Sequence, residues 1–166
     1  MGMYASLMQI APNVLEELKN DPAFIEGLKE EGSLELSLDK AWHGIHFILT
    51  GETKRGETPL SKAIMGGRAV EQLADIDLNN DLYLGYHYYL TAEEVRQTAN
   101  ALSKISTTEF KARFSPDAMI EADIYPNIWD RGDAKTIEFL LPFYEKLVNY
   151  YKDAARRKNA MLFIVF

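Results

Sequence analysis

The spacing of apolar and polar residues along the chain predicts strands at both ends, with helices between them. Residues 3–10 (MYASLMQI) and 160–166 (AMLFIVF) form short apolar runs typical of strands in a sheet. Residues 34–38 alternate leucine with polar residues, and residues 82–90 are rich in aromatic side chains, so two further strands are expected there. The run 161–166 is far too short to cross a bilayer, and no membrane-spanning segment is expected.

Apolar positions that recur every three to four residues predict the helices. Pro12 occupies the first position of one helix, and Thr91 and Glu94 form a capping box at the start of another. The longest helix is expected over residues 134–157, where Pro142 should kink or split it. Shorter helices are expected near residues 22–31, 60–65, 107–114 and 116–121.

Helices outnumber strands in this order, and the strands lie at the two ends and in the middle of the chain. We therefore expect an α+β fold with a small mixed sheet, in which the terminal strands are neighbours and the helices pack mainly on one face. The 166 residues fit a single domain, residues 1–166, which can bury a core without disulfides or a structural metal.

Composition and charge narrow the classes of function. The chain carries a formal net charge of −7 and has no cysteine. The missing thiols exclude disulfides, thiol catalysis and thiolate metal sites, and they fit a reducing, cytoplasmic compartment. Proteins that bind nucleic-acid backbones usually present a basic surface, so no nucleic acid is expected as a partner. The acidic balance favours a basic protein partner instead, and the sequence leaves the oligomeric state open.

The stretch 39–51 (DKAWHGIHFILTG) holds the densest group of candidate functional residues. Asp39 is expected to cap a helix that ends at Gly51, and His46 lies on the apolar face of that helix. His46 is therefore predicted to be a core histidine bonded through one ring nitrogen, whereas His43 is predicted to lie near solvent.

The three histidines, His43, His46 and His87, are enough ligands for a catalytic zinc site. Zinc-binding helices more often space two histidines four residues apart, whereas His43 and His46 are three apart. Residues 75–81 begin like a calcium loop but lack its glycine and its bidentate glutamate. We therefore predict neither a metal site nor a cofactor.

Several motifs resemble those of the YfbM-like family, a bacterial domain of unknown function. The most specific is the pattern D-K-x-W-x-x-I-H-x-x-L-T-G over residues 39–51, and the others are Met1-Gly2-Met3, Pro59-Leu60-Ser61 followed by Gly66, and Ile124-Tyr125-Pro126. The resemblance covers nearly the whole chain and implies a single α+β domain of bacterial, cytoplasmic type. It implies no activity, although some relatives are regarded as immunity proteins beside bacterial toxins. His43 lies outside the family pattern, which weakens any mechanism based on paired histidines.

Two kinds of function fit these observations. The first is a non-enzymatic, protein-binding domain, of the immunity type, whose acidic surface attracts a basic partner. The missing catalytic signature favours this hypothesis. Aromatic side chains often anchor protein interfaces. The candidate binding residues are Trp42, His46, Tyr86, His87, Tyr125 and Trp129.

The alternative is a small hydrolase or transferase with a cleft near the Asp39–Gly51 helix. His46 would act as general base, oriented by a carboxylate. Asp39 lies about 10 Å from His46 along the helix, so Asp123 or Asp130 would have to complete the pair. The polar loop 51–59 would then be a lid. Whether the chain is an enzyme stays open, with the binding function favoured.

Overall fold

The computed structural model describes residues 2–21, 28, 35–70 and 87–165, without the side chains of residues 87 and 133. In chain order the elements are β1 (Ala5–Ile10), α1 (Pro12–Asn20), β2 (Glu35–Asp39), α3 (Trp42–Thr50), α4 (Pro59–Lys62), β3 (Arg68–Ala69), β4 (His87–Leu90), α5 (Ala92–Ser103), α6 (Thr107–Arg113), α7 (Pro116–Glu121), α8 (Asp133–Arg156) and β5 (Ala160–Val165). Tyr86, the turn at 75–81 and the side chain of His87 lie outside the described residues, as does the helix predicted for 22–31 apart from residue 28.

The strands form one sheet in the order β2-β1-β5-β4-β3. The two terminal strands are neighbours near its centre, as predicted, because β1 and β5 pair along their whole length, from Ala5 opposite Val165 to Ile10 opposite Ala160. Every pairing among the described strands is antiparallel, so the sheet is not mixed as expected. The apolar pattern within a strand does not encode the direction of its neighbour, which is why the sequence could not reveal this.

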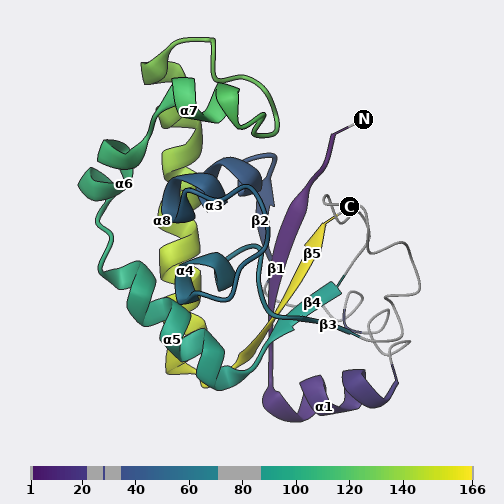
Figure 1. Cartoon of the computed structure of the whole chain (residues 1–166). Helices are drawn as coiled ribbons and strands as arrows, with labels where there is room; N and C mark the ends of the chain where they lie inside the picture. Colours follow the sequence, from purple (N-terminus) through teal and green to yellow (C-terminus); the bar gives the residue numbers. More distant parts are fainter. Residues whose placement is uncertain (1, 22–27, 29–34, 71–86, 166) are drawn as a thin grey trace.

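Alternate residues of the central strands are buried on opposite faces of the sheet. Leu7 and Phe163 join the large core made with the main group of helices, whereas Met8 and Leu162 join a smaller core made with α1. Figure 1 shows α3 to α8 gathered on one side of the sheet, with α1 set apart from them at one end, so the predicted one-sided layer of helices is confirmed. Burial on both faces explains why β5 is apolar at every position.

The helix α8 forms the spine of the helical layer. Its buried face carries Leu140, Tyr144, Leu147 and Tyr151. Pro142 lies inside α8 on the exposed side, and the helix continues past it, so the predicted split does not occur. Packing of buried side chains on both sides of Pro142 outweighs the one backbone hydrogen bond that proline cannot donate. No helix in the described part of the chain, α8 included, is long and apolar enough to cross a membrane.

The start of α3 differs from the prediction, whereas its end agrees. Ala41 is the N-cap and no side chain caps the helix. Asp39, the predicted cap, is the last residue of β2, with a φ of 47°. Its backbone pairs with Ala5 of β1, and this pairing delays the start of the helix. At the other end Gly51 has a φ of 72°, a left-handed conformation that glycine adopts at no steric cost.

Candidate functional site

Helix α3 packs against the loop 122–132 between α7 and α8, and this contact gathers several of the candidate residues. Gly44 permits the close approach, because a Cβ atom there would lie 2.6 Å from Cη2 of Trp129. The side chain of Trp129 is 2% exposed, and its Nε1 donates to the carbonyl of Ile124 at 2.6 Å. Trp129 is therefore locked against the helix from the inside.

His43 links α3 to two different loops. Its ring is 5% exposed and stacks on Trp42, with the ring centroids 5.2 Å apart. Nε2 lies 3.1 Å from the carbonyl oxygen of Thr53, and Nδ1 lies 3.0 Å from the backbone nitrogen of Tyr125. A carbonyl only accepts and an amide N–H only donates, so the ring is neutral with its proton on Nε2. The prediction that His43 lies near solvent is wrong, because the loops that cover it come from distant parts of the chain.

His46 is a buried core histidine, as predicted from its place on the apolar face. Nε2 donates to the carbonyl oxygen of Lys54 at 2.8 Å. Nδ1 is buried and has no hydrogen-bond partner among the described residues. Burial lowers the pKa of His46 to about 4, against the opposing effect of the bond to Lys54, and the neighbouring His43 lowers it further. A ring enclosed in this way has no open face from which to accept a proton from a substrate.

The loop predicted as a lid, residues 51–59, is bonded to its surroundings at three consecutive residues. The carbonyls of Thr53 and Lys54 accept from the two histidines of α3. The guanidinium of Arg55 donates to the carbonyl of Gly67. In this structure the loop is therefore a bonded edge of the core.

Neither candidate carboxylate reaches His46. Asp123 and Asp130 are both exposed, and within the described residues the ring of His46 bonds only to backbone. Asp123 acts on His43 instead: burial lowers the pKa of His43, whereas the bond to Thr53 and the charge of Asp123 raise it. In the described part of the chain, no three side chains of metal-binding type lie together in a way that could hold a metal ion. The acid–base pair that catalysis at His46 would need is not assembled here.

Trp42 and Tyr125 hold the segment that leads into β1. Nε1 of Trp42 donates to the carbonyl of Met3 at 3.1 Å, and the backbone nitrogen of Met3 donates to the Tyr125 hydroxyl at 2.8 Å. The two rings lie 6.0 Å apart between their centroids. These bonds give both aromatic residues a structural task at the edge of the sheet.

The outer surface of the same loop carries a small hollow, which we call the acidic pocket. It has a volume of about 200 Å³ and is lined by Ile120, Asp123, Asn127, Trp129 and Asp130. Ile120 is 51% exposed, and it is one of two large apolar side chains that are exposed within the described residues. The pocket therefore combines an apolar wall with two exposed carboxylates.

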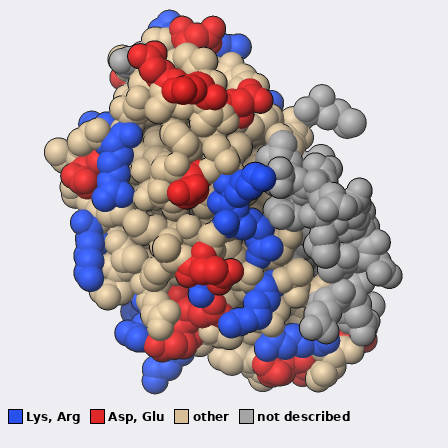
Figure 2. Space-filling view, viewed as in Figure 1, with Lys and Arg blue, Asp and Glu red and all other residues tan. Residues whose placement is uncertain are grey.

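The acids around this pocket lack the basic partners that other acids have. Asp117 and Glu121 on α7 join Asp123 and Asp130, and none of these four forms an ion pair with a described lysine or arginine. By contrast, Glu93 pairs with Arg96, Glu94 with Lys62 and Arg68, Glu109 with Arg113, and Asp153 with Arg156 and Arg157. Figure 2 shows acidic side chains gathered at the end of the molecule where α7 lies. Unpaired carboxylates give this end a negative potential.

Three residues of this surface, Asp117, Ile120 and Glu121, are absent from the candidates that the sequence suggested. A signal for them exists in α7. Its two acids stand one helical turn apart beside Ile120, and Met119 is its buried residue. An apolar side chain in such an acidic turn is a candidate surface contact, but its exposure depends on which face of α7 packs inward.

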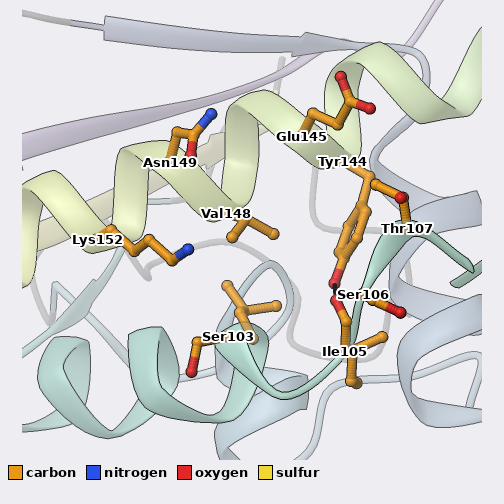
Figure 3. Close-up of a pocket in the computed structure, with 10 residues that line it drawn as sticks. Ser103, Ile105, Ser106, Thr107, Tyr144, Glu145, Val148, Asn149 and Lys152 are labelled. Atoms are coloured by element: carbon orange, nitrogen blue, oxygen red, sulfur yellow. Dashed lines mark hydrogen bonds between the residues drawn. The ribbon is translucent and has the colours of Figure 1, made fainter. Parts of the chain in front are cut away.

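A second hollow, of about 210 Å³, lies between the α5–α6 turn and α8 (Figure 3). The hydroxyls of Ser103, Ser106 and Tyr144 at this cleft already bond to backbone groups. Figure 3 shows Glu145 and Lys152 at separate points along α8, so opposite charges border the cleft. Polar groups that satisfy their own fold do not define a ligand, and this cleft is the weaker candidate.

An α+β domain with an antiparallel sheet and a buried pair of helix histidines is thus the class of protein that the structure defines. Residues 1–164 match the family described as Domain of unknown function (DUF1877), and the chain belongs to that family. It is similar to Protein YfbM of Escherichia coli (strain K12), with 24% identity over 174 residues that cover 99% of each chain.

The fold is also similar to that of a solved structure. The crystal structure of YfbM from Escherichia coli, titled a protein of unknown function, matches with a TM-score of 0.71 and 22% sequence identity. The match covers 98% of this chain and 99% of that one. The expected family and the α+β class are therefore confirmed, and neither relative brings an activity with its name.

Proposed function

We propose that this protein is a non-enzymatic binding domain, and that its acidic pocket takes a lysine or arginine side chain from a basic protein partner. The observation that carries this function is the meeting of an exposed apolar side chain with unpaired carboxylates. Ile120 offers a surface for the aliphatic stem of such a side chain, and Asp123 and Asp130 attract its charged head. The negative potential of the α7 end steers a basic partner toward the same place.

A role of the immunity type fits this function. A nuclease-type toxin binds a polyanion and therefore presents a basic surface, which the acidic end of this molecule would complement. A cytoplasmic location belongs to the same proposal and agrees with the absence of cysteine. The enzymatic alternative has less support, because the ring of His46 is enclosed and bonds to the backbone of Lys54.

A hexalysine peptide tests the binding function in the whole 166-residue chain. Calorimetry at low salt compares the wild type with the double variant Asp123→Asn/Asp130→Asn. Asparagine readily adopts the positive φ of 53° found at Asp123, so the backbone is preserved. We expect the double variant to bind about fivefold or more weakly, as the loss of two partly exposed ion pairs predicts.

The matched control is Glu16→Gln/Glu17→Gln, which removes the same charge from α1, at the other end of the molecule from α7 (Figure 1). We expect this control to bind within about twofold of the wild type, because a distant surface charge contributes little at close range. An equal loss of affinity in both double variants would mean that overall charge, and not the acidic pocket, attracts the peptide.

A further inference from the structure

A single peptide group connects the buried His43 to the wall of the acidic pocket. Its N–H, from Tyr125, donates to Nδ1 of His43 at 3.0 Å. Its carbonyl, from Ile124, accepts from Nε1 of Trp129 at 2.6 Å and from the backbone nitrogen of Asn127 at 3.1 Å. Trp129 and Asn127 line the pocket, whereas His43 lies behind it. Because a peptide group is planar and rigid, its N–H and its carbonyl cannot reorient independently.

His43 holds this peptide group only while Nδ1 is unprotonated. Nε2 already carries the proton that is donated to Thr53, so a second proton must bind at Nδ1. That proton would face the N–H of Tyr125, and a hydrogen bond would become a contact between two donors. The ring is 5% exposed and has no free path to water. The Ile124–Tyr125 peptide must therefore shift, and the bond to Trp129 shifts with it.

The charged and titratable groups that act on His43 come from two elements. His46, on the same helix, opposes a positive charge on His43. Asp123, from the loop 122–132, favours that charge. From the loop 51–59 the ring meets the backbone carbonyl of Thr53, and Trp42 covers one of its faces. Asp123 also lines the pocket, so the carboxylate that would attract a basic partner is the one that promotes protonation of His43.

We propose that His43 is a pH-sensitive positioning residue of the acidic pocket: its neutral ring keeps the pocket in the binding form, and its protonation releases the Ile124–Tyr125 peptide and weakens binding of the basic partner. Since this regulation rests on the proposed function, the partner and the proton oppose each other by linkage. A cation beside Asp123 disfavours the charged ring, and the charged ring disfavours the bound partner. Binding is therefore strongest at neutral pH and above, and it declines under mild acid.

Nuclear magnetic resonance of the free protein tests the switch without any partner. The Tyr125 amide, the Trp129 indole N–H and the His43 ring are followed from about pH 7.5 to about pH 5 in the ¹⁵N-labelled chain, a range that spans the ordinary pKa of histidine. We expect both N–H signals to shift with the same midpoint as the His43 ring. A ring that stays neutral throughout, or N–H signals that do not follow its titration, would overturn the inference.

Binding of hexalysine at the two pH values tests the consequence. Lysine stays charged over this range, so the peptide itself does not change. We expect the wild type to lose about tenfold in affinity at the lower pH, and His43→Gln, which offers one donor and one acceptor without titrating, to lose less than about twofold. His46→Gln is the matched control and should keep the pH dependence.

The outcomes separate the two proposals. A wild type that does not bind hexalysine even at the higher pH would overturn the proposed function. A wild type that binds equally well at both pH values would overturn the switch alone. If a variant does not fold, the wild-type titration of the Tyr125 and Trp129 signals decides the question by itself.

Discussion

At the scale of single residues, the two histidines of α3 differ through one ring nitrogen. Both donate from Nε2 to a carbonyl of the same loop, at Thr53 and Lys54. Nδ1 of His43 accepts from Tyr125, whereas Nδ1 of His46 has no partner in the part of the chain that the structure describes. Protonation of His43 therefore disrupts one defined bond, whereas protonation of His46 places an unpaired charge in the core.

The fold should consequently lose stability in acid through His46. Burial lowers the pKa of this ring to about 4 in the folded chain, while the unfolded chain keeps the ordinary value of about 6.5. Between these values the unfolded state binds more protons, so the stabilising contribution is complete above about pH 6.5 and is lost as the pH falls toward 4. We expect the free energy of unfolding to fall by about 3 kcal/mol over this window on account of His46.

Urea denaturation at a series of pH values measures this effect. In His46→Gln, which keeps a donor for the carbonyl of Lys54 and does not titrate, the fall over the same window should be smaller by about 3 kcal/mol. A wild-type stability that is constant from about pH 6.5 to about pH 4 would contradict the burial of a neutral ring at this position.

At the scale of elements, features set by neighbours in the sequence are predictable, and features set by neighbours in space are not. The capping box of Thr91 and Glu94 and the end of α3 at Gly51 follow from short stretches of sequence, and the structure contains both. Asp39 marks the limit. Its side chain has the chemistry of a cap, but its pairing with Ala5 in the sheet moves the helix start onward. Local chemistry does not reveal pairing with a distant strand.

The candidate site is predictable in part for the same reason. Asp123, Trp129 and Asp130 are candidates by residue type, and the structure brings all three to one pocket. The task expected of the carboxylates, orienting His46, is not met, because His46 bonds to Lys54 in another loop. The link from His43 to the pocket joins residues 82 positions apart, and nothing in the local sequence announces it.

The helix α8 offers a test of how packing overrides sequence. Pro142 is exposed inside an unbroken helix and cannot donate the backbone hydrogen bond of its position. Pro142→Ala restores that donor and should raise the free energy of unfolding by about 1–3 kcal/mol in urea denaturation. The exposed control Glu145→Ala should change it by less than about 0.5 kcal/mol. A loss of stability in Pro142→Ala would show that α8 depends on a bend at this proline.

At the scale of the whole molecule, the fold sets an unpaired acidic surface directly outside a buried, neutral contact. Residues 115–132 contain four acids and one arginine, so this short segment carries a large share of the net charge of −7. The interior of the same segment is held by α3 through Gly44 and His43. A partner that binds outside and a proton that binds inside therefore act on one loop, which is the physical basis of the proposed regulation.

A map of where hexalysine binds decides whether the acidic pocket is the binding site. Backbone and indole N–H shifts of the labelled chain are recorded at about pH 7.5 and low salt while the peptide is added, because low salt preserves the attraction between exposed charges. We expect the largest shifts at Ile120, Asp123, Asn127 and the Trp129 indole, and small shifts on α1. Shifts spread evenly over the acidic surface, or centred on α1 with none at the pocket, would contradict the proposed function.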